Sequence, residues 1–310
     1  MKHTLTLRPL LLALLLACLP QWAKAYDSYD FTVDGIYYTI TSSTDRTVAV
    51  QYNTSPNPNQ RRNKYSGDVV IPSTVIYNET VYTVTSISAY EFYGSTGLTS
   101  ITIPSSVESI GEYAFYECTG LTSLTLPESI VSIESSAFRG CTGLTNLTLN
   151  EGLTSIESYV FYGCTGLTSL TLPESMVGIG DYAFYNCTGL TSLTLNEGLT
   201  VIGSYAFRSC TGLTSLTIPS TVETIYGYAF GISSSSTALT SVTILGPTYS
   251  AAYAFQYQQG LTSITVNVGA LTDDECTYYS LSGQRIPAPV KGQTCIIRFS
   301  NGTSMKVLVK

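Results

Sequence analysis

The chain has 310 residues, only 11% of them charged, and its formal net charge is −7. An acidic chain of this kind repels phosphate backbones, which argues against nucleic acid as a partner. The 24 tyrosines and the abundance of Ser, Thr and Gly favour a β-rich or repeat protein over a helical bundle.

Residues 1–25 are typical of an export signal. Lys2 and Arg8 form a basic start, residues 10–19 an apolar core, and Ala23-Lys24-Ala25 a small-residue cleavage site. The apolar core is about half of the ~20 residues that a membrane-spanning helix needs, so we expect no transmembrane segment. The residues ending at Cys18 also match a lipoprotein signal, and the Ala-x-Ala ending favours cleavage after Ala25.

Cleavage there would remove the only histidine, His3, and the three basic residues Lys2, Arg8 and Lys24. The 14 basic residues then fall to 11 against 21 acidic ones, a net charge of −10. Without histidine the mature chain lacks the Ser-His-Asp and Cys-His catalytic arrangements and histidine-ligated zinc. We therefore expect a protein that is not an enzyme and binds no cofactor.

A 23-residue repeat dominates the chain after an opening stretch, residues 26–66, that carries Asp34-Gly35, a pair suited to a tight hairpin turn. The repeat spans residues 67–269, and its most regular units open with Cys-Thr-Gly-Leu-Thr. Their first residues are Cys118, Cys141, Cys164, Cys187 and Cys210. One unit buries too little apolar surface to offset the entropy of ordering its backbone, so the units must stack.

Apolar columns within the unit predict its conformation. Leu121, Leu124 and Leu126 alternate with Ser and Thr, which predicts a short strand in a parallel sheet with leucine inside. Ala137-Phe138 predicts a short helical or 3₁₀ turn that closes the coil. Its core phenylalanine recurs in successive units as Phe138, Phe161, Phe184 and Phe207.

The pattern C-x-x-L-x-x-L-x-L-P followed by I-x-x-x-A-F resembles the treponemal-type leucine-rich repeat of BspA-like surface proteins. The resemblance implies a β-rich leucine-rich-repeat solenoid over residues 67–269 and a β-hairpin cap over residues 26–66. It also implies a bacterial protein that is secreted or attached to the outer-membrane surface. Family members are described as adhesins for host matrix or other cell-surface proteins, so the implied partner is an extracellular protein or glycan.

Residues 270–310 break the repeat. Tyr279 to Ile286, Lys291-Gly292 and the ending Lys306 to Lys310 are similar to the C-terminal sorting signal of the type IX secretion system, which implies the export machinery as a partner. The alternative is a β-hairpin that seals the end of the solenoid.

The five repeat cysteines should form a ladder with Cα atoms about 4.8 Å apart. This lies within disulfide range, but ladder side chains point in parallel, so we expect buried free thiols. Pairing of Cys276 with Cys295 stays open. Glu128, Glu151, Glu174 and Glu197 form a second column, which we interpret as exposed and solvated rather than as a cation site, since no Asp-rich calcium loop accompanies it.

Two tyrosine columns flank the core phenylalanines and are the candidate partner-binding residues. The first is Tyr113, Tyr159, Tyr182, Tyr205 and Tyr228, and the second is Tyr116, Tyr162 and Tyr185. A spacing of three residues predicts that the columns share one side, and tyrosine is common at interface hot spots. Arg139 and Arg208 replace tyrosine in the second column, which favours an exposed position there. The alternative is that the tyrosines only pack against the next repeat.

Two hydroxyl columns on the outer face of the predicted sheet favour a different function. They are Ser123/Thr125, Asn146/Thr148, Ser169/Thr171, Ser192/Thr194 and Ser215/Thr217. They resemble the Thr-x-Thr arrays of solenoid ice-binding proteins, so the alternative function is an ice- or polysaccharide-binding face.

Overall fold

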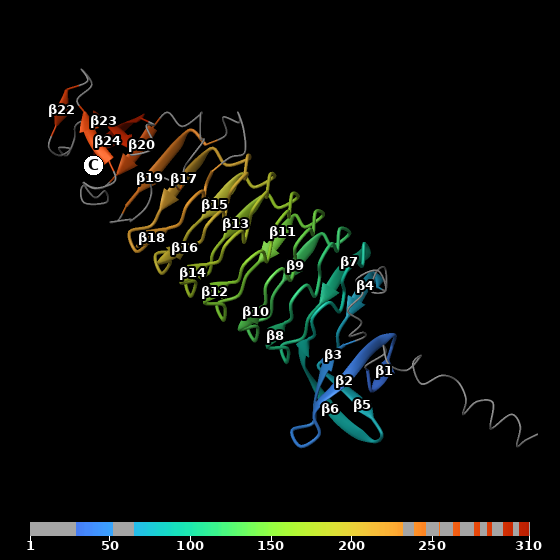
Figure 1. Ribbon diagram of the computed structural model, residues 1–310. Helices are drawn as coiled ribbons and strands as arrows, with labels where there is room; N and C mark the ends of the chain where they lie inside the picture. Colours follow the sequence, from blue (N-terminus) through green and yellow to red (C-terminus); the bar gives the residue numbers. More distant parts are fainter. Residues whose placement is uncertain are drawn as a thin grey trace, which may run out of the picture.

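The computed structural model describes residues 29–51, 65–231 and 239–245, Ala254, and the segments 263–266, 276–279, 284–286, 294–299 and 304–309. These residues form a row of stacked coils with a small N-terminal sheet at one end (Figure 1). The export signal predicted for residues 1–25 lies outside the described residues.

The N-terminal sheet begins with β1 (Phe31–Val33), β2 (Ile36–Ser42) and β3 (Thr47–Val50), which are antiparallel neighbours. Val33 faces Ile36, so the loop is Asp34-Gly35, and both residues have positive φ, 50° and 79°. This is the conformation that a two-residue hairpin requires. A second hairpin, β5 (Thr74–Tyr77) and β6 (Thr80–Ile87), completes the sheet, and β6 pairs parallel with β3.

Each coil contributes a strand to two parallel faces, where the sequence predicted only one. The first face carries the Ser-Leu-Thr strands: β4 (Ser66–Val70), β7 (Gly97–Thr102), β9 (Ser123–Thr125), β11 (Asn146–Thr148), β13 (Ser169–Thr171), β15 (Ser192–Thr194), β17 (Ser215–Ile218), β19 (Ser241–Ile244) and β20 (Ser263–Val266). The second face continues from β6 through two-residue strands: β8 (Ser109–Ile110), β10 (Ser132–Ile133), β12 (Ser155–Ile156), β14 (Gly178–Ile179), β16 (Val201–Ile202) and β18 (Thr224–Ile225). The second set is too short to show an alternating sequence pattern.

The C-terminal strands extend the first face. β24 (Ser304–Val309) pairs parallel with β20, and β23 (Thr294–Phe299) pairs antiparallel with β24. β21 (Cys276–Tyr279) and β22 (Arg285–Ile286) follow antiparallel. The tail therefore adds a hairpin to the last described coil strand, the arrangement expected of an end seal.

A phenylalanine ladder forms the centre of the core. Neighbouring rings from Phe92 to Phe230 are stacked with centroids 4.8–5.5 Å apart and planes within 14° of parallel. The leucine and isoleucine columns surround it and are mostly buried. Leu147 and Leu149, the counterparts of Leu124 and Leu126 in the next unit, are only partly buried, although they pack against the core.

Successive turns, rather than a helix, surround each ladder phenylalanine. In the unit of Phe138, the N–H groups of Phe138 and Gly140 donate to the Val160 and Tyr162 carbonyls of the next coil, at 2.9 and 2.8 Å. The intervening Arg139 N–H donates to the carbonyl three residues back, as in a 3₁₀ turn. Because every second N–H is used between coils, a continuous helix cannot form there.

Two residues in each of these turns adopt left-handed backbone angles. In one unit they are Tyr159 (φ 63°) and Gly163 (φ 73°), and the glycine position is taken by Ser209 (φ 62°) in another. Left-handed geometry costs a residue with a Cβ about 1–2 kcal/mol. The buried Ser209 hydroxyl also has no hydrogen-bond partner within the described structure.

We predict that Leu124→Ala lowers the free energy of unfolding by ~2–5 kcal/mol, because Leu124 is 2% exposed and packs between coils. Thr125→Ala on the same strand should cost much less, since its side chain is exposed. Denaturant unfolding of the two variants measures both values. Equal losses would contradict the assignment of the strand faces.

We predict that Ser209→Gly raises the free energy of unfolding by about 1 kcal/mol, because glycine removes the left-handed penalty and the unsatisfied hydroxyl. Gly163→Ala is the converse control. A Cβ there meets nothing within 4 Å, so its expected loss of about 1 kcal/mol is purely conformational. Thermal or denaturant unfolding checks both, and a destabilised Ser209→Gly variant would refute the strain argument.

Candidate partner-binding surface

The tyrosines of the coil-closing turns form one continuous surface, which we call the tyrosine strip. Its first column has Tyr90, Tyr113, Tyr159, Tyr182, Tyr205 and Tyr228, and its second column has Tyr93, Tyr116, Arg139, Tyr162, Tyr185 and Arg208. Tyr90 and Tyr93 were not among the predicted residues. They belong to the first, irregular unit, and their spacing of three residues around Phe92 is the signal that identifies them.

Rings in each column stack from one coil to the next. In the first column, neighbouring centroids are 4.6–5.1 Å apart, and in the second they are 4.7–4.8 Å apart. Ser136 interrupts the first column between Tyr113 and Tyr159. Stacking leaves mainly ring edges and hydroxyls to meet a ligand, because the ring faces are covered by their neighbours.

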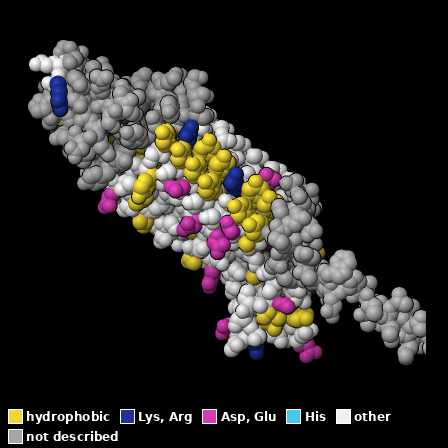
Figure 2. All heavy atoms as spheres, in the orientation of Figure 1, with side chains coloured by type: hydrophobic (Ala, Val, Ile, Leu, Met, Phe, Trp, Pro, Cys, Tyr) yellow, Lys and Arg dark blue, Asp and Glu magenta, His cyan; other side chains and the backbone are white. Residues whose placement is uncertain are grey.

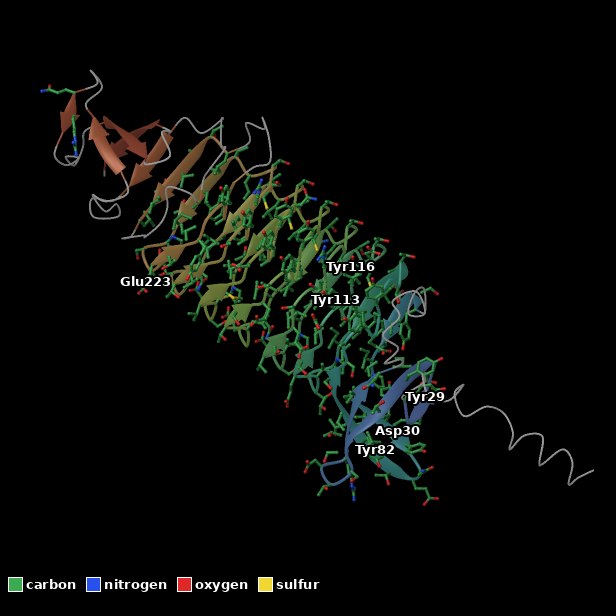
Figure 3. The ribbon with its side chains drawn as sticks, in the orientation of Figure 1. Tyr29, Asp30, Tyr82, Tyr113, Tyr116 and Glu223 are labelled. Carbon is green, nitrogen blue, oxygen red and sulfur yellow. The ribbon has the colours of Figure 1, made fainter. Side chains whose placement is uncertain are left out.

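The two columns lie side by side, as the spacing of three residues predicted. Tyr113 and Tyr116 have centroids 5.7 Å apart, and the pairs in the other coils are similar. Figure 3 shows Tyr113 and Tyr116 on the same side of the stacked coils. The left-handed backbone at each first-column tyrosine sets this orientation.

All ten tyrosines of the strip are half-buried, whereas the ladder phenylalanines are fully covered. The tyrosines therefore do both things that the sequence left open: they pack against the next coil and they remain accessible. Figure 2 shows hydrophobic side chains gathered over the middle coils, with basic groups among them.

Arg139 and Arg208 lie within the strip against tyrosine rings. The Arg139 guanidinium carbon is 4.5 Å from the Tyr162 ring centroid, and that of Arg208 is 5.2 Å from the Tyr205 centroid. Both distances are within cation–π range. The arginines therefore continue the aromatic packing where a tyrosine is missing.

Two strip tyrosines, Tyr116 and Tyr182, have a raised pKa. Burial raises the pKa of Tyr116, and the Glu117 carboxylate, which accepts a hydrogen bond from its hydroxyl, raises it further. Burial and the neighbouring tyrosines likewise raise the pKa of Tyr182. These two tyrosines thus present neutral hydroxyls, which act as hydrogen-bond donors and acceptors.

The five ladder cysteines lie in the core, behind the strip, and are fully or almost fully buried. Each thiol donates a hydrogen bond to a phenylalanine carbonyl in the preceding coil, at 3.0–3.4 Å, as Cys118 does to Phe92. Burial raises the pKa of Cys141 to about 12. Such thiols are poor nucleophiles and poor metal ligands.

The glutamate column has a structural role in addition to being exposed. Glu151 accepts hydrogen bonds from the Glu174 and Ser175 N–H groups of the next coil, at 3.2 and 3.1 Å, and Glu197 accepts one from Ser220. These bonds join consecutive coils. The members of the two hydroxyl columns, from Ser123 to Thr217, are exposed on the first face.

Neither a metal site nor a membrane span is present in the described part of the chain. No group of three or more His, Cys, Asp or Glu residues among these residues could hold a metal ion. No helix within the same residues is both long and apolar enough to cross a bilayer.

Comparison with known proteins identifies the repeat. The family model of the BspA-type leucine-rich repeat region matches six copies, over residues 85–181 and 177–290. No curated protein matches the chain.

Several solved bacterial structures are similar to this chain. A leucine-rich repeat protein from Bacteroides ovatus is 23% identical, with a TM-score of 0.49. The match covers 77% of this chain and 71% of the Bacteroides ovatus protein. A leucine-rich repeat protein from Eubacterium ventriosum is 27% identical, with a TM-score of 0.48. The match covers 61% of this chain and 50% of the Eubacterium ventriosum protein. A leucine-rich cell surface protein from Faecalibacterium prausnitzii is 17% identical, with coverages of 79% and 95% and a TM-score of 0.40.

We predict that the five ladder cysteines remain unpaired and resist alkylation in the folded chain at pH 8, because their thiols are buried and inaccessible to the reagent. Iodoacetamide labelling followed by peptide mass spectrometry should find them modified only after denaturation. A disulfide mass between two ladder peptides in a non-reduced sample would contradict this.

Proposed function

Because the chain belongs to the BspA-type leucine-rich repeat family, we propose that it is a non-catalytic interaction protein that acts at the cell surface. The tyrosine strip is its binding surface. The partner is a protein, either of a host matrix or of another cell surface, and the chain is therefore an adhesin.

The observation that carries this proposal is the half-burial of the strip. Each tyrosine is held by stacking at 4.6–5.1 Å, so little side-chain entropy remains to be lost on binding. Its exposed edge combines apolar area with a hydroxyl, the combination that makes tyrosine frequent at interface hot spots. The neighbouring coils repeat this edge along the whole strip, which suits a large protein surface.

The proposed surface location rests on sequence features and on the family. Residues 1–25 would direct the chain across the inner membrane, and the tail similar to a type IX sorting signal would direct export and attachment. The tail strands β21 to β24 extend the solenoid sheet, so an end seal and a sorting signal are compatible roles for the same residues.

The hydroxyl columns favour a second candidate function, an ice- or polysaccharide-binding face. Their members are exposed and lie in register across paired strands, as Thr125 does opposite Thr148. This face has little apolar area to bury, so a hydrogen-bonded lattice or glycan suits it better than a protein. Thermal hysteresis of the purified chain would be the signature of ice binding.

We predict that replacing Tyr116, Tyr162 and Tyr185 together with Ser weakens partner binding at least tenfold, because the accessible edges of the second column are lost. Immobilised wild-type and variant chains would be compared against matrix proteins and neighbouring-cell extracts. Circular dichroism and the unfolding midpoint establish that the variant is folded.

Two controls decide the result. The corresponding Tyr→Phe variant keeps the stacked rings and removes only hydroxyls, so it should fold normally and lose less affinity. Replacing Thr125, Thr171 and Thr217 with Ala removes hydroxyls from the hydroxyl columns of the first face and leaves the tyrosine strip intact. This variant should bind the protein partner as the wild type does. Unchanged affinity in a folded Ser variant would rule out the second column, and loss of binding in the Thr variant would transfer the site to the hydroxyl face.

A further inference from the structure

The two basic residues between positions 65 and 231 both lie in the tyrosine strip. Between residues 65 and 231 the chain has 14 Asp and Glu residues but only two basic ones, Arg139 and Arg208. A scattered surface arginine in so acidic a region would be expected to pair with a carboxylate. The two arginines instead share one column.

Neither arginine uses its guanidinium donors within the described structure. Neither forms an ion pair with a carboxylate of the described residues, and the buried Arg208 Nε has no hydrogen-bond partner there. Both groups pack against rings: Arg139 against Tyr116, Tyr159 and Tyr162, and Arg208 against Tyr205 and Tyr228. An arginine in such a contact can direct its terminal Nη–H groups, which lie in the guanidinium plane, at a planar anion such as a carboxylate.

The spacing of the two arginines is set by the solenoid. They are three coils apart, and the ring separation per coil on this side is 4.6–5.1 Å. The two guanidinium groups are therefore about 14 Å apart along the solenoid axis. Four residues of an extended chain rise by about the same distance, and residues four apart project from the same side of a strand.

We propose that the tyrosine strip binds an extended acidic peptide segment that runs along the solenoid axis. Its two carboxylates, four residues apart, bind Arg139 and Arg208. The residue midway between them projects from the same side and lies over the Tyr162–Tyr185 pair, whose centroids are 4.8 Å apart. An apolar or aromatic side chain fits this position, because ring edges and no charged group occupy the column there. This inference rests on the proposed function and names the chemistry of its ligand.

The surrounding charge favours a peptide with isolated carboxylates over a polyanion. The carboxylates of Glu117 and Asp181 act on the strip residues Tyr116 and Tyr182. A densely sulfated or phosphorylated polymer would meet Asp181 between the two arginines and Glu117 one coil before Arg139, and would be repelled. A peptide that carries one acidic group at each arginine and an uncharged segment between them avoids this repulsion.

The test uses the full chain and a dye-labelled synthetic peptide that has two glutamates four residues apart, a phenylalanine midway, and Ser or Thr elsewhere. Fluorescence anisotropy should show saturable binding that weakens as salt is raised. A peptide with glutamine in place of both glutamates should bind at least tenfold more weakly. A peptide with glutamates three residues apart should bind no better than one with a single glutamate, because its carboxylates project from opposite sides.

Tyrosine is a suitable replacement for each arginine in a control variant. Arg139→Tyr and Arg208→Tyr introduce the residue that other coils have at this position, so each variant should stay folded while losing one charge. We expect about a tenfold loss of peptide affinity for each single variant and no measurable binding for the double variant. Arg→Lys should lose part of the affinity, because lysine keeps the charge without the planar donor geometry.

Three results would overturn the inference: no binding of the glutamate peptide to the wild-type chain, equal affinity for the double Arg→Tyr variant, or tight binding of a sulfated oligosaccharide without peptide binding. A partner protein that the triple Tyr→Ser variant loses and the double Arg→Tyr variant retains would separate the two proposals. It would support the strip as a binding surface and reject its acidic ligand.

Discussion

Stacking of one coil on the next is the constraint on which the whole structure depends. A coil of 23 residues places a short strand on each of two faces and one phenylalanine at the centre, and none of these is stable alone. The backbone sets the step between coils, since alternate N–H groups of the turns donate to the next coil. The phenylalanine rings follow the same step, 4.8–5.5 Å from centroid to centroid. Any side chain at a given place in the unit therefore meets its own counterpart.

This constraint explains why two kinds of coil alternate along the chain, one with Pro-Glu-Ser (residues 127–129 and 173–175) and one with Asn-Glu-Gly (residues 150–152 and 196–198). In one kind of coil, Asn150 Nδ2 donates to the Ile130 carbonyl of the preceding coil, and a Cβ at Gly152 would lie 2.7 Å from that same nitrogen. In the other kind, Ser175 Oγ donates to the Leu153 carbonyl. Asn with Gly in one kind of coil and Ser in the other therefore serve the same purpose, since each donates a hydrogen bond to a carbonyl of the coil before it. Residues 118–163 and 164–209 are similar 46-residue segments, and each contains one coil of either kind.

The same constraint arranges surface side chains in columns, one residue from each coil. A position where a column has a different residue type therefore stands out. A repeated tyrosine is stabilised by its neighbours, and an arginine in its place must satisfy the same aromatic contacts. Arg139 and Arg208 do so by packing against tyrosine rings, and neither forms an ion pair with a carboxylate of the described residues. A cation that is kept away from intramolecular carboxylates is available to an external one, which links the packing of the solenoid to the chemistry of its partner.

The sequence by itself determined the period, the inward leucine and phenylalanine columns and the Asp34-Gly35 hairpin, because these follow from local spacing and turn chemistry. It also identified the tyrosine columns and their shared side. Tertiary structure alone decided the second parallel face, whose strands are two residues long, and which N–H groups of the closing turns donate to the next coil. Both arise from hydrogen bonds between coils, which join residues about 22 positions apart and leave no local pattern. For the same reason only the stacked coils show that a tyrosine can be packed and accessible at once.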